Sequence, residues 1–309
     1  MNKIKIIDLF AGIGGIRKGF EKASPNIECV FTSEWNKYSA QTYSANFPNE
    51  EIHGDITQID ENIIPNHDIL LAGFPCQPFS QAGLKKGFSD TRGTLFFDIE
   101  RILIAKKPKA FLLENVKQLK GHDKGNTLKT IIEHLKNIGY ENVQYEILRA
   151  RDFGLPQNRE RIYIVGFLDK NIQFEFPKPT NEPTKVGDIL ENEVDEKYTI
   201  SDRLWAGHQR RKQENKLKGK GFGYGIVNEN SEYTNTISAR YYKDGSEILV
   251  EQKGKNPRKL TPREAARLQG FPDDFIIPVS DNQAYQQFGN SVAINVVEQV
   301  AKQIIKHLN

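Results

Sequence analysis

The alternation of strand-like and helix-like segments in the first 168 residues is the feature that most constrains the fold. Short apolar runs predict six strands, at residues 4–9, 28–33, 68–73, 110–114, 143–148 and 161–167. Helical spacing of apolar residues between these runs predicts helices at residues 16–23, 37–47, 95–105 and 127–138. Strands and helices in alternation are typical of an α/β fold with a doubly wound, mostly parallel sheet.

The pattern changes from about Pro177 onward. Three closely spaced prolines are followed by a basic stretch and by short alternating runs at residues 236–242 and 248–250, without long helices. These features predict a second, smaller and β-rich domain over residues 186–286. Helical spacing returns at residues 293–307, which we expect to pack on the first domain. The first domain then comprises residues 1–185 plus 287–309.

Composition sets broad limits on function. The chain has 309 residues, of which 38% are hydrophobic and 27% charged, as in an ordinary globular protein. A net charge of +3 does not by itself indicate nucleic-acid binding. Residues 203–220, however, carry seven Lys or Arg side chains against one acid, Glu214, which indicates either a solvated surface helix or a phosphate-binding segment.

Cysteine usage and the chain start point to a cytoplasmic protein. The two cysteines, Cys29 and Cys76, form neither a disulfide framework nor a metal-binding spacing, so we expect no metal. The segment Met1-Asn-Lys-Ile-Lys lacks the apolar stretch of a signal peptide, and no apolar run approaches the length of a membrane span. We therefore expect a cytoplasmic location and no membrane partner.

A glycine-rich turn, Ala11-Gly-Ile-Gly-Gly15, directly follows the first predicted strand and precedes the first helix. Such a turn lets a ligand approach the backbone and a helix amino terminus, although the spacing does not match Gly-x-Gly-x-x-Gly and so disfavours NAD. Glu34, after the second strand, suits bonding to ribose hydroxyls. Trp35 offers a flat face for adenine, and Asp55 an acceptor for an exocyclic amine. The alternatives are a core aromatic for Trp35 and a helix cap for Asp55.

A cysteine framed by prolines follows the third strand predicted in the chain. Residues 73–80 are Gly-Phe-Pro-Cys-Gln-Pro-Phe-Ser, and they continue the apolar run at residues 68–72. Pro75 and Pro78 fix φ on both sides of Cys76 and remove two backbone donors. A lone cysteine is usually a small buried hydrophobe. The stiff turn at the carboxyl edge of a sheet, where α/β folds bind ligands, favours a nucleophile instead.

Together, these segments resemble the DNA (cytosine-5) methyltransferases of type II restriction-modification systems. The resemblance extends over almost the whole chain, through Asp8–Gly15, Glu34-Trp35, Gly54–Ile56 and the turn around Cys76. Further similar segments are Gln157–Arg161, Arg258–Pro272 and Gln287–Val292. The resemblance implies an S-adenosylmethionine-dependent methyltransferase fold with a target-recognition domain. It also implies transfer of a methyl group to carbon 5 of a flipped-out cytosine in double-stranded DNA.

The chemistry of such a transfer assigns roles to three residues. Carbon 5 of cytosine is a poor nucleophile, and addition of a Cys76 thiolate to carbon 6 would activate it. Glu114, at the end of an apolar strand, would deliver a proton or hydrogen bond to ring nitrogen 3. The resemblance assigns Arg161 to the 2-oxo group, in an oxyanion-hole role. A structural ion pair is the alternative for Glu114.

The resemblance also implies two larger sets of contacts. Expected cofactor-binding residues are Phe10, Gly12, Gly14, Gly15, Glu34, Trp35, Asp55, Pro75, Leu95 and Asn290. Expected DNA-binding residues are Gln77, Ser80, Gln81, Ala82, Arg92, Arg159, Thr236 and Arg240, although a structural role is the stronger interpretation for Arg159. Residues 77–95 resemble the loop that closes over DNA, with Gln81 or Ala82 filling the gap left by the flipped base.

The second domain contains the candidate for target readout. Thr236-Ile237 resembles a Thr-Leu pair that recurs in recognition regions, and residues 239–249 resemble segments that read CCGG, CCWGG or CCNGG. We therefore predict a short palindrome beginning with CC. Arg240 is the candidate for a guanine contact, with a salt bridge to Asp244 or Glu247 as the alternative.

Two other functions compete with this interpretation. One is a tRNA cytosine-5 methyltransferase of the same fold, and the other is a DNA-binding regulator that has lost its catalytic activity. The insertion of about 80 residues, suited to reading a DNA groove, disfavours the first. The presence of Cys76, Glu114 and Arg161 disfavours the second. We further expect a monomer, with a cognate restriction endonuclease that forms no stable complex with it.

Overall fold

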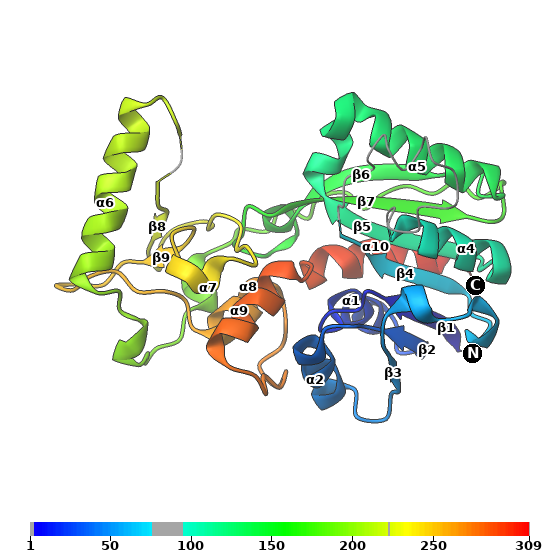
Figure 1. The fold of residues 1–309 in the computed structure, drawn as a ribbon, viewed down its shortest axis with the longest axis horizontal. Helices are drawn as coiled ribbons and strands as arrows, with labels where there is room; N and C mark the ends of the chain where they lie inside the picture. The colour runs from blue at the N-terminus through cyan, green and yellow to red at the C-terminus, as the bar shows by residue number, and fades with distance from the viewer. Residues whose placement is uncertain (1–2, 76–94, 222, 309) are drawn as a thin grey trace. The chain divides into compact units, whose positions relative to one another are not determined.

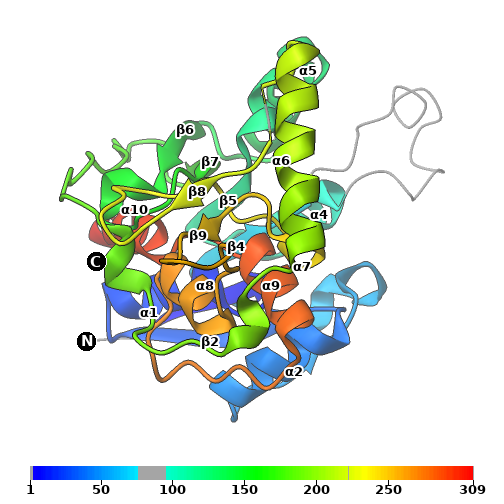
Figure 2. The same ribbon diagram turned by 90° about the vertical axis from the view of Figure 1, so that its left-hand side faces the viewer.

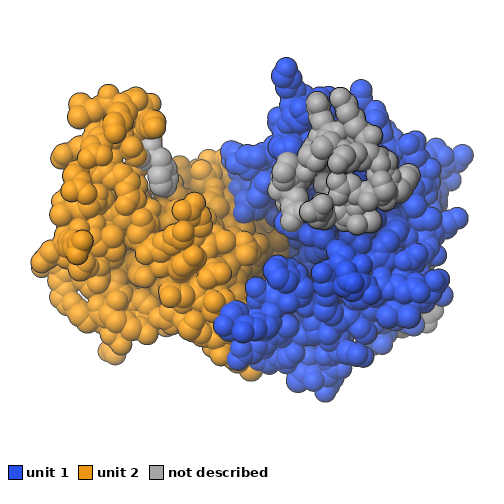
Figure 3. All heavy atoms as spheres, in the orientation of Figure 1, with its two compact units in different colours: residues 1–148, 160–178, 297–309 blue, residues 149–159, 179–296 orange. Residues whose placement is uncertain are grey.

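The computed structural model describes residues 3–75, 95–221 and 223–308, and the chain divides into two compact units (Figure 1, Figure 3). Unit 1 comprises residues 1–148, 160–178 and 297–309, and unit 2 comprises residues 149–159 and 179–296. Unit 2 thus includes residues 149–159, 179–185 and 287–296, which the sequence placed in the catalytic domain. Compactness alone does not define a folding domain, so the expected domain ranges stay a prediction.

Unit 1 is built around a seven-stranded sheet with the strand order β3-β2-β1-β4-β5-β7-β6 (Figure 1). Its strands are β1 (Ile4–Leu9), β2 (Ile27–Ser33), β3 (Ile52–His53), β4 (Ile69–Gly73), β5 (Ala110–Val116), β6 (Gln144–Arg149) and β7 (Glu160–Phe167). Strands β1 to β5 pair in parallel, and β7 pairs antiparallel to β5. The predicted α/β fold with a mostly parallel sheet is confirmed.

The helices of unit 1 lie close to their predicted positions. They are α1 (Gly15–Ala23), α2 (Lys37–Asn46), α4 (Phe96–Lys106), α5 (Asn126–Asn137) and most of α10 (Ile294–Lys306). Side chains of α4 and α5 join those of β1, β4 and β5 in a continuous apolar core. Helix α10 packs on α1, because a Cβ added at Gly19 would lie 2.5 Å from the Val297 side chain. The carboxyl-terminal helix thus contacts the first domain, as expected.

The parallel strands bring four predicted segments to one edge of the sheet. The glycine turn follows β1, Glu34 follows β2, and the turn at Phe74 and Pro75 follows β4. Glu114 lies near the end of β5. Carboxyl ends of parallel strands share an edge, which is where ligands bind in open α/β sheets.

Unit 2 contains more helix than the sequence indicated (Figure 1, Figure 2). Its regular elements are α6 (Asp202–Leu217), α7 (Tyr241–Asp244), α8 (Pro262–Leu268), α9 (Asp281–Asn290), and the strands β8 (Ile226–Val227) and β9 (Leu249–Val250). The expectation of a β-rich region without long helices was wrong, since α6 alone spans 16 residues. His208 is the only buried residue of α6, so this helix has almost no apolar periodicity to detect.

Short 3₁₀ helices complete both units. They are η1 (Ile56–Gln58), η2 (Glu61–Ile63), η4 (Lys117–Gly125), η5 (Ala150–Phe153), η6 (Val186–Ile189) and η7 (Glu196–Tyr198). All of them lie in the connections between the longer elements, as is usual for 3₁₀ helices.

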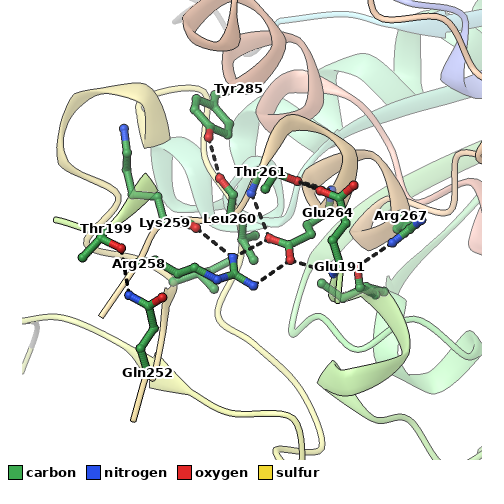
Figure 4. Close-up of polar contacts among 12 residues, drawn as sticks. Glu191, Thr199, Gln252, Arg258, Lys259, Leu260, Thr261, Glu264, Arg267 and Tyr285 are labelled. Carbon is green, nitrogen blue, oxygen red and sulfur yellow. Dashed lines mark hydrogen bonds and ion pairs between the residues drawn. The ribbon is translucent and has the colours of Figure 1, made fainter. Parts of the chain in front are cut away.

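A buried ion pair at the start of α8 organises the interior of unit 2 (Figure 4). The two terminal nitrogens of Arg258 lie 2.7 and 2.8 Å from the two carboxylate oxygens of Glu264, which is fully buried. The same carboxylate accepts bonds from the backbone N–H groups of Glu191 and Thr261. Thr261 in turn caps α8 through its side chain, which completes a capping box. One fully satisfied carboxylate therefore joins three segments of the unit.

We expect Glu264→Ala to lower the free energy of unfolding of unit 2 by about 3–5 kcal/mol, because it leaves the Arg258 charge buried without its partner. The chain has two tryptophans, so in a Trp35→Phe background Trp205 of α6 is the only one and its fluorescence reports on unit 2. Denaturant titrations of the two proteins give the difference.

Glu196→Ala is the matched control, since the side chains of its pair with Lys255 are 69% and 55% exposed. That change should lower the stability by less than about 1 kcal/mol. Equal losses for Glu264→Ala and Glu196→Ala would show that the buried pair has no special role.

Candidate active site

The turn between β1 and α1 has an unusual backbone conformation. Phe10, Gly12 and Gly14 have φ values of 53°, 56° and 82°. This left-handed region is easily adopted by glycine and is uncommon for a residue such as phenylalanine. A Cβ at Gly14 would lie 2.5 Å from the Phe47 ring, so the turn is also held closely against the end of α2. A strained, tightly packed glycine turn at this edge is well suited to bring backbone groups up to a ligand.

Glu34 fixes this turn from the neighbouring strand. One of its carboxylate oxygens accepts a bond from the Gly12 N–H at 2.7 Å, and the other accepts one from the Asn36 N–H at 2.7 Å. Burial raises the pKa of Glu34, and these backbone hydrogen bonds act against that shift. A carboxylate offers about four acceptor positions. Glu34 thus retains capacity for ribose hydroxyls while it holds the turn.

The alternative role of a core aromatic fails for Trp35, whereas the alternative role of a helix cap holds for Asp55. Trp35 is 75% exposed, which excludes a role as a core aromatic. Asp55 does cap a helix, since its side chain accepts a bond from the Thr57 N–H at 3.0 Å at the start of η1. Pro75 is exposed after β4, and the half-buried Leu95 directly precedes α4. The cofactor contacts of these residues stay predictions.

Asp8 is a polar residue of this edge for which no separate role was predicted. It lies near the end of β1, is 1% exposed, and its carboxylate oxygens have no hydrogen-bond partner among the described residues. Burial raises the pKa of Asp8 well above its usual value, while the charge of Arg17 opposes this shift. Arg17 itself binds Glu21 at 2.7 Å. Two acids, Asp8 and Glu34, therefore lie next to the glycine turn, and burial disfavours the charged form of Asp8.

An acid and a guanidinium lie beside the end of β4. Gly73 pairs with Glu114 across β4 and β5, and Val116 pairs with Arg161 across β5 and β7. The Nε atom of Arg161 lies 3.1 Å from a carboxylate oxygen of Glu114, with side chains 16% and 10% exposed. Cys76, three residues after Gly73, lies outside the described residues. Glu114 thus has the partner that a structural ion pair requires, at the sheet edge where the sequence predicts catalysis.

Asn115 supports the same edge, although the sequence did not single it out. Its side chain is 2% exposed and donates from Nδ2 to the backbone carbonyl of Phe74 at 2.9 Å. Its Oδ1 atom accepts a bond from the Val116 N–H at 2.8 Å. Asn115 therefore fixes the chain two residues before Cys76. The sequence does contain a signal for this role, because a polar amide directly after Glu114 in an apolar strand needs a hydrogen-bond partner.

Arg159 is buried inside unit 2, with an exposed fraction of 1%. It donates to the carbonyls of Ile237 at 3.1 Å and Gly289 at 3.0 Å, and also to that of Ser291. Gln157 binds the backbone of the same segment by accepting from the Ile237 N–H. This burial favours the structural role for Arg159 over the predicted contact with DNA.

Arg240 is exposed, and both acids proposed as its salt-bridge partners are engaged elsewhere. Asp244 pairs with Arg211 at 3.0 Å. Glu247 accepts a bond from the Ser238 hydroxyl at 2.5 Å. Within the described part of the chain, Arg240 makes no salt bridge. The salt-bridge alternative for Arg240 is therefore not observed, and its guanidinium remains exposed to solvent.

The remaining predicted site residues have less informative positions. Thr236 is half-buried and donates to the Asn158 carbonyl at 2.7 Å. Asn290 is the exposed last residue of α9, and Gly15 begins α1. Several predicted DNA contacts lie outside the described residues, namely Gln77, Ser80, Gln81, Ala82 and Arg92.

Among the described residues, no cluster of three or more His, Cys, Asp or Glu side chains has a geometry that could hold a metal ion. In the same ranges, no helix combines the length and the apolar character needed to cross a membrane.

Solved structures of methyltransferases share this fold. An Entamoeba histolytica methyltransferase, EhMeth, superposes with a TM-score of 0.79 at 23% identity, covering 100% of both chains. The S. pombe Dnmt2 methyltransferase superposes with a TM-score of 0.82 at 22% identity, covering 99% of this chain and 100% of the other. At these identities the likeness defines the methyltransferase fold alone.

The model of the C-5 cytosine-specific DNA methylase family matches residues 4–306, and the chain belongs to this family. It is 71% identical over 300 residues to the type II methyltransferase M.NlaX of Neisseria lactamica, covering 97% of this chain and 96% of the relative. It is 64% identical over 310 residues to M1.ScrFI of Lactococcus lactis subsp. cremoris, covering 99% and 79%. The protein is a DNA cytosine-5 methyltransferase of the restriction-modification type, with S-adenosylmethionine as methyl donor.

We expect Trp35→Ala to weaken binding of S-adenosylmethionine by about 1–3 kcal/mol, the usual contribution of an aromatic platform to stacking with a base. Isothermal titration calorimetry measures the affinity. In a Trp205→Phe background, Trp35 is the only tryptophan and its fluorescence should change during the same titration.

Tyr145→Ala is the control, because Tyr145 is a 43% exposed aromatic residue on β6 with no predicted contact to the cofactor. The Tyr145→Ala variant should bind S-adenosylmethionine with the affinity of the unmodified protein. If Trp35→Ala also bound the cofactor normally, the adenine would have to lie elsewhere.

Proposed function

We propose that this methyltransferase acts on a flipped-out cytosine through a covalent bond between the Cys76 sulfur and carbon 6 of the base. The observation that carries the proposal is the Glu114–Arg161 pair beside Gly73, at the strand end from which the chain continues to Cys76. Addition of the thiolate to carbon 6 makes carbon 5 enamine-like and nucleophilic. After methylation, loss of the proton from carbon 5 and cleavage of the sulfur–carbon bond restore the aromatic ring and the free thiolate.

In this proposal, Glu114 and Arg161 receive the negative charge that builds up on the ring. Glu114 donates a proton or hydrogen bond to ring nitrogen 3, and Arg161 donates to the 2-oxo group. Both side chains are largely shielded from water, which strengthens these interactions. Asn115 acts indirectly, because its bond to the Phe74 carbonyl keeps the chain that leads to Cys76 in place.

The residues at the glycine turn fit the cofactor. The positive-φ turn, the Glu34 carboxylate and the exposed Trp35 side chain together offer contacts for a nucleoside. S-adenosylmethionine, when bound, supplies an electrophilic methyl group. In the proposal, Glu34 binds the ribose hydroxyls and Trp35 stacks on adenine. The contacts of Phe10, Gly12, Gly14, Gly15, Asp55, Pro75, Leu95 and Asn290 rest on the sequence resemblance.

The proposed target is a cytosine within a specific sequence of double-stranded DNA. A cytosine inside a duplex must leave the stack before its carbon 5 can react. We propose that residues 77–95 close over the DNA, that exposed cations of α6 bind phosphates, and that Arg240 reads a guanine in the major groove. The exposure of Arg240 supports this assignment. The target proposed from residues 239–249 is a short palindrome beginning with CC, of the CCGG, CCWGG or CCNGG type.

No particular feature supports either alternative function, the tRNA cytosine-5 methyltransferase or the catalytically silent regulator. The relatives at 71% and 64% identity are named type II methyltransferases, which favours DNA over tRNA as the substrate. The intact Glu114–Arg161 pair disfavours a catalytically silent regulator. A monomeric state and a separate cognate endonuclease stay part of the proposal.

The covalent mechanism predicts that DNA with 5-fluorocytosine at the target forms a denaturation-resistant adduct in the presence of S-adenosylmethionine, because fluorine cannot leave as a proton does. Cys76→Ser should abolish the adduct. Glu114→Gln should lower turnover by about 10²- to 10⁴-fold, the usual range for a lost general acid. Gel electrophoresis detects the adduct, and transfer of tritiated methyl groups measures turnover.

Both variants should bind S-adenosylmethionine normally, which separates lost chemistry from lost folding. Glu100→Gln is a matched control, since Glu100 is a 15% exposed acid of the same unit that binds His134. Normal turnover by Cys76→Ser, or an adduct through another residue, would contradict the mechanism. Normal turnover by Glu114→Gln would remove that residue from the chemistry.

The target proposal predicts that bisulfite sequencing of modified plasmid DNA shows a palindrome beginning with CC, methylated at the inner cytosine. Arg240→Ala should cost about 1–3 kcal/mol of discrimination at one base pair, since it removes a bidentate guanine contact. Lys216→Ala with Lys218→Ala should instead weaken binding to all sequences and flatten its salt dependence. A site without a CC start would overturn the target proposal but not the enzyme class.

A further inference from the structure

We propose that helix α6 positions the base-reading turn at Arg240, by holding Asp244 at the other end of that turn. The inference deepens the proposed function and rests on the assignment of Arg240 to base reading. In this view, Arg211 and His208 are positioning residues. They set how well the protein distinguishes its site from other sequences, and they add little to its general affinity for DNA.

The turn that carries Arg240 is anchored at its start to the interior of unit 2. Helix α7 begins at Tyr241, which is fully buried and lies 5.1 Å from Tyr285 between ring centres. The Tyr241 hydroxyl donates to the Ile248 carbonyl at 2.7 Å and accepts from the Leu260 N–H at 2.8 Å. The Arg240 N–H also binds the Ser238 hydroxyl at 3.1 Å. One end of the turn is therefore fixed to the core.

The other end of the turn is joined to α6 through Asp244, and the chain after it is held to the interior by a bond from the Gly225 N–H to the Ser246 carbonyl at 2.9 Å. Arg211 of α6 pairs with the Asp244 carboxylate at 3.0 Å, and His208 of α6 donates from Nε2 to the Asp244 carbonyl at 3.2 Å. His208 is the one fully buried residue of α6. The pKa of Asp244 is lowered, because its bonds from Arg211 and from Ser246 outweigh the effect of burial. Both the backbone and the side chain of Asp244 thus depend on α6.

Helix α6 is mostly exposed and is held by a few contacts of its side chains. Trp205 packs on Tyr224 with ring centres 4.9 Å apart, and the Lys212 ammonium lies 4.1 Å from the same ring. The Arg210 side chain is 78% accessible and pairs with Glu214 of the same helix at 3.8 Å. Arg210 and Arg211 are thus adjacent cations of equal charge, and one of them joins α6 to α7.

The contacts of Arg211 and His208 with Asp244 form a joint between α6 and α7. This joint leads to a specific prediction about function. Phosphate contacts set the register of a protein on DNA, and base contacts specify the sequence. Without the contacts between Asp244 and α6, the turn would keep its anchors at Tyr241 and in the chain after Asp244 but would lose its hold on α6, and Arg240 would sample a wider range of angles. Loss of the joint should therefore reduce discrimination, while the number of phosphate contacts, and with it the salt dependence of binding, changes little.

The test compares three variants on duplexes that carry the site found by bisulfite mapping, and on duplexes with one base pair of that site changed. Asp244→Asn removes the acceptor charge without removing a cation from α6. It should lower the ratio of cognate to altered kcat/KM by about 2–5-fold, the effect expected for a partly exposed ion pair. Arg211→Ala should lower the ratio equally and leave the salt slope almost unchanged, because the Arg211 charge is already paired with Asp244. Arg210→Ala should reduce only the salt slope.

Non-additivity provides the second readout. In an Arg240→Ala background, Asp244→Asn should cause no further loss of discrimination, because the side chain that it positions is gone. Arg211→Lys should restore most of the discrimination lost in Arg211→Ala. Neither result is expected from a general loss of stability.

The outcomes separate this inference from the proposed function. Normal discrimination by both Asp244→Asn and Arg211→Ala, together with reduced discrimination by Arg240→Ala, would overturn the positioning role and leave the base reader intact. Reduced discrimination by the two joint variants, together with normal discrimination by Arg240→Ala, would show that another side chain of the turn reads the base. Equal effects of Arg210→Ala and Arg211→Ala on discrimination would overturn the joint.

Discussion

The register between β4 and β5, in which Gly73 faces Glu114, is the constraint on which the catalytic edge depends. Parallel pairing makes both strands end at the same edge, so the chain leaves β4 toward Cys76 beside a carboxylate of β5. The antiparallel pairing of β7 then places Arg161 opposite Val116, where the guanidinium reaches Glu114. Sheet hydrogen bonds, which are rigid, therefore fix the acid and the guanidinium to within bonding distance, without help from a flexible loop.

Buried polar groups in this protein fall into two kinds. Glu264 and Arg258 satisfy each other and the backbone around them, and Arg159 binds carbonyls inside unit 2. Such groups hold segments together, because leaving any one of them unpaired would be costly. Asp8 is the opposite case, with buried oxygens that have no hydrogen-bond partner among the described residues. Burial disfavours the charged form of this acid and raises its pKa, while the nearby charge of Arg17 opposes that shift.

The elements that the sequence predicted well are those with strong local signals. Continuous apolar runs identify β4 and β5 because both are buried on two faces. Motif spacing places Glu34 and Glu114 at the ends of strands, and their roles stay predictions. The two residues of β3 are too few to form a pattern, and α6 is polar nearly all around. Burial of Arg159, the Asn115 bond to Phe74 and the Arg211–Asp244 pair depend on contacts between distant segments, which sequence spacing does not encode.

The ion pair at Glu114 also has a consequence for when the proposed chemistry begins. A guanidinium at 3.1 Å favours the ionised form of a carboxyl group, whereas a donor to ring nitrogen 3 must carry a proton. In the proposal, the cytosine 2-oxo group takes over a bond from Arg161 as the base enters, which weakens the interaction that favours the ionised carboxyl group. Entry of the base and protonation of the acid are then linked, with the proton supplied by solvent.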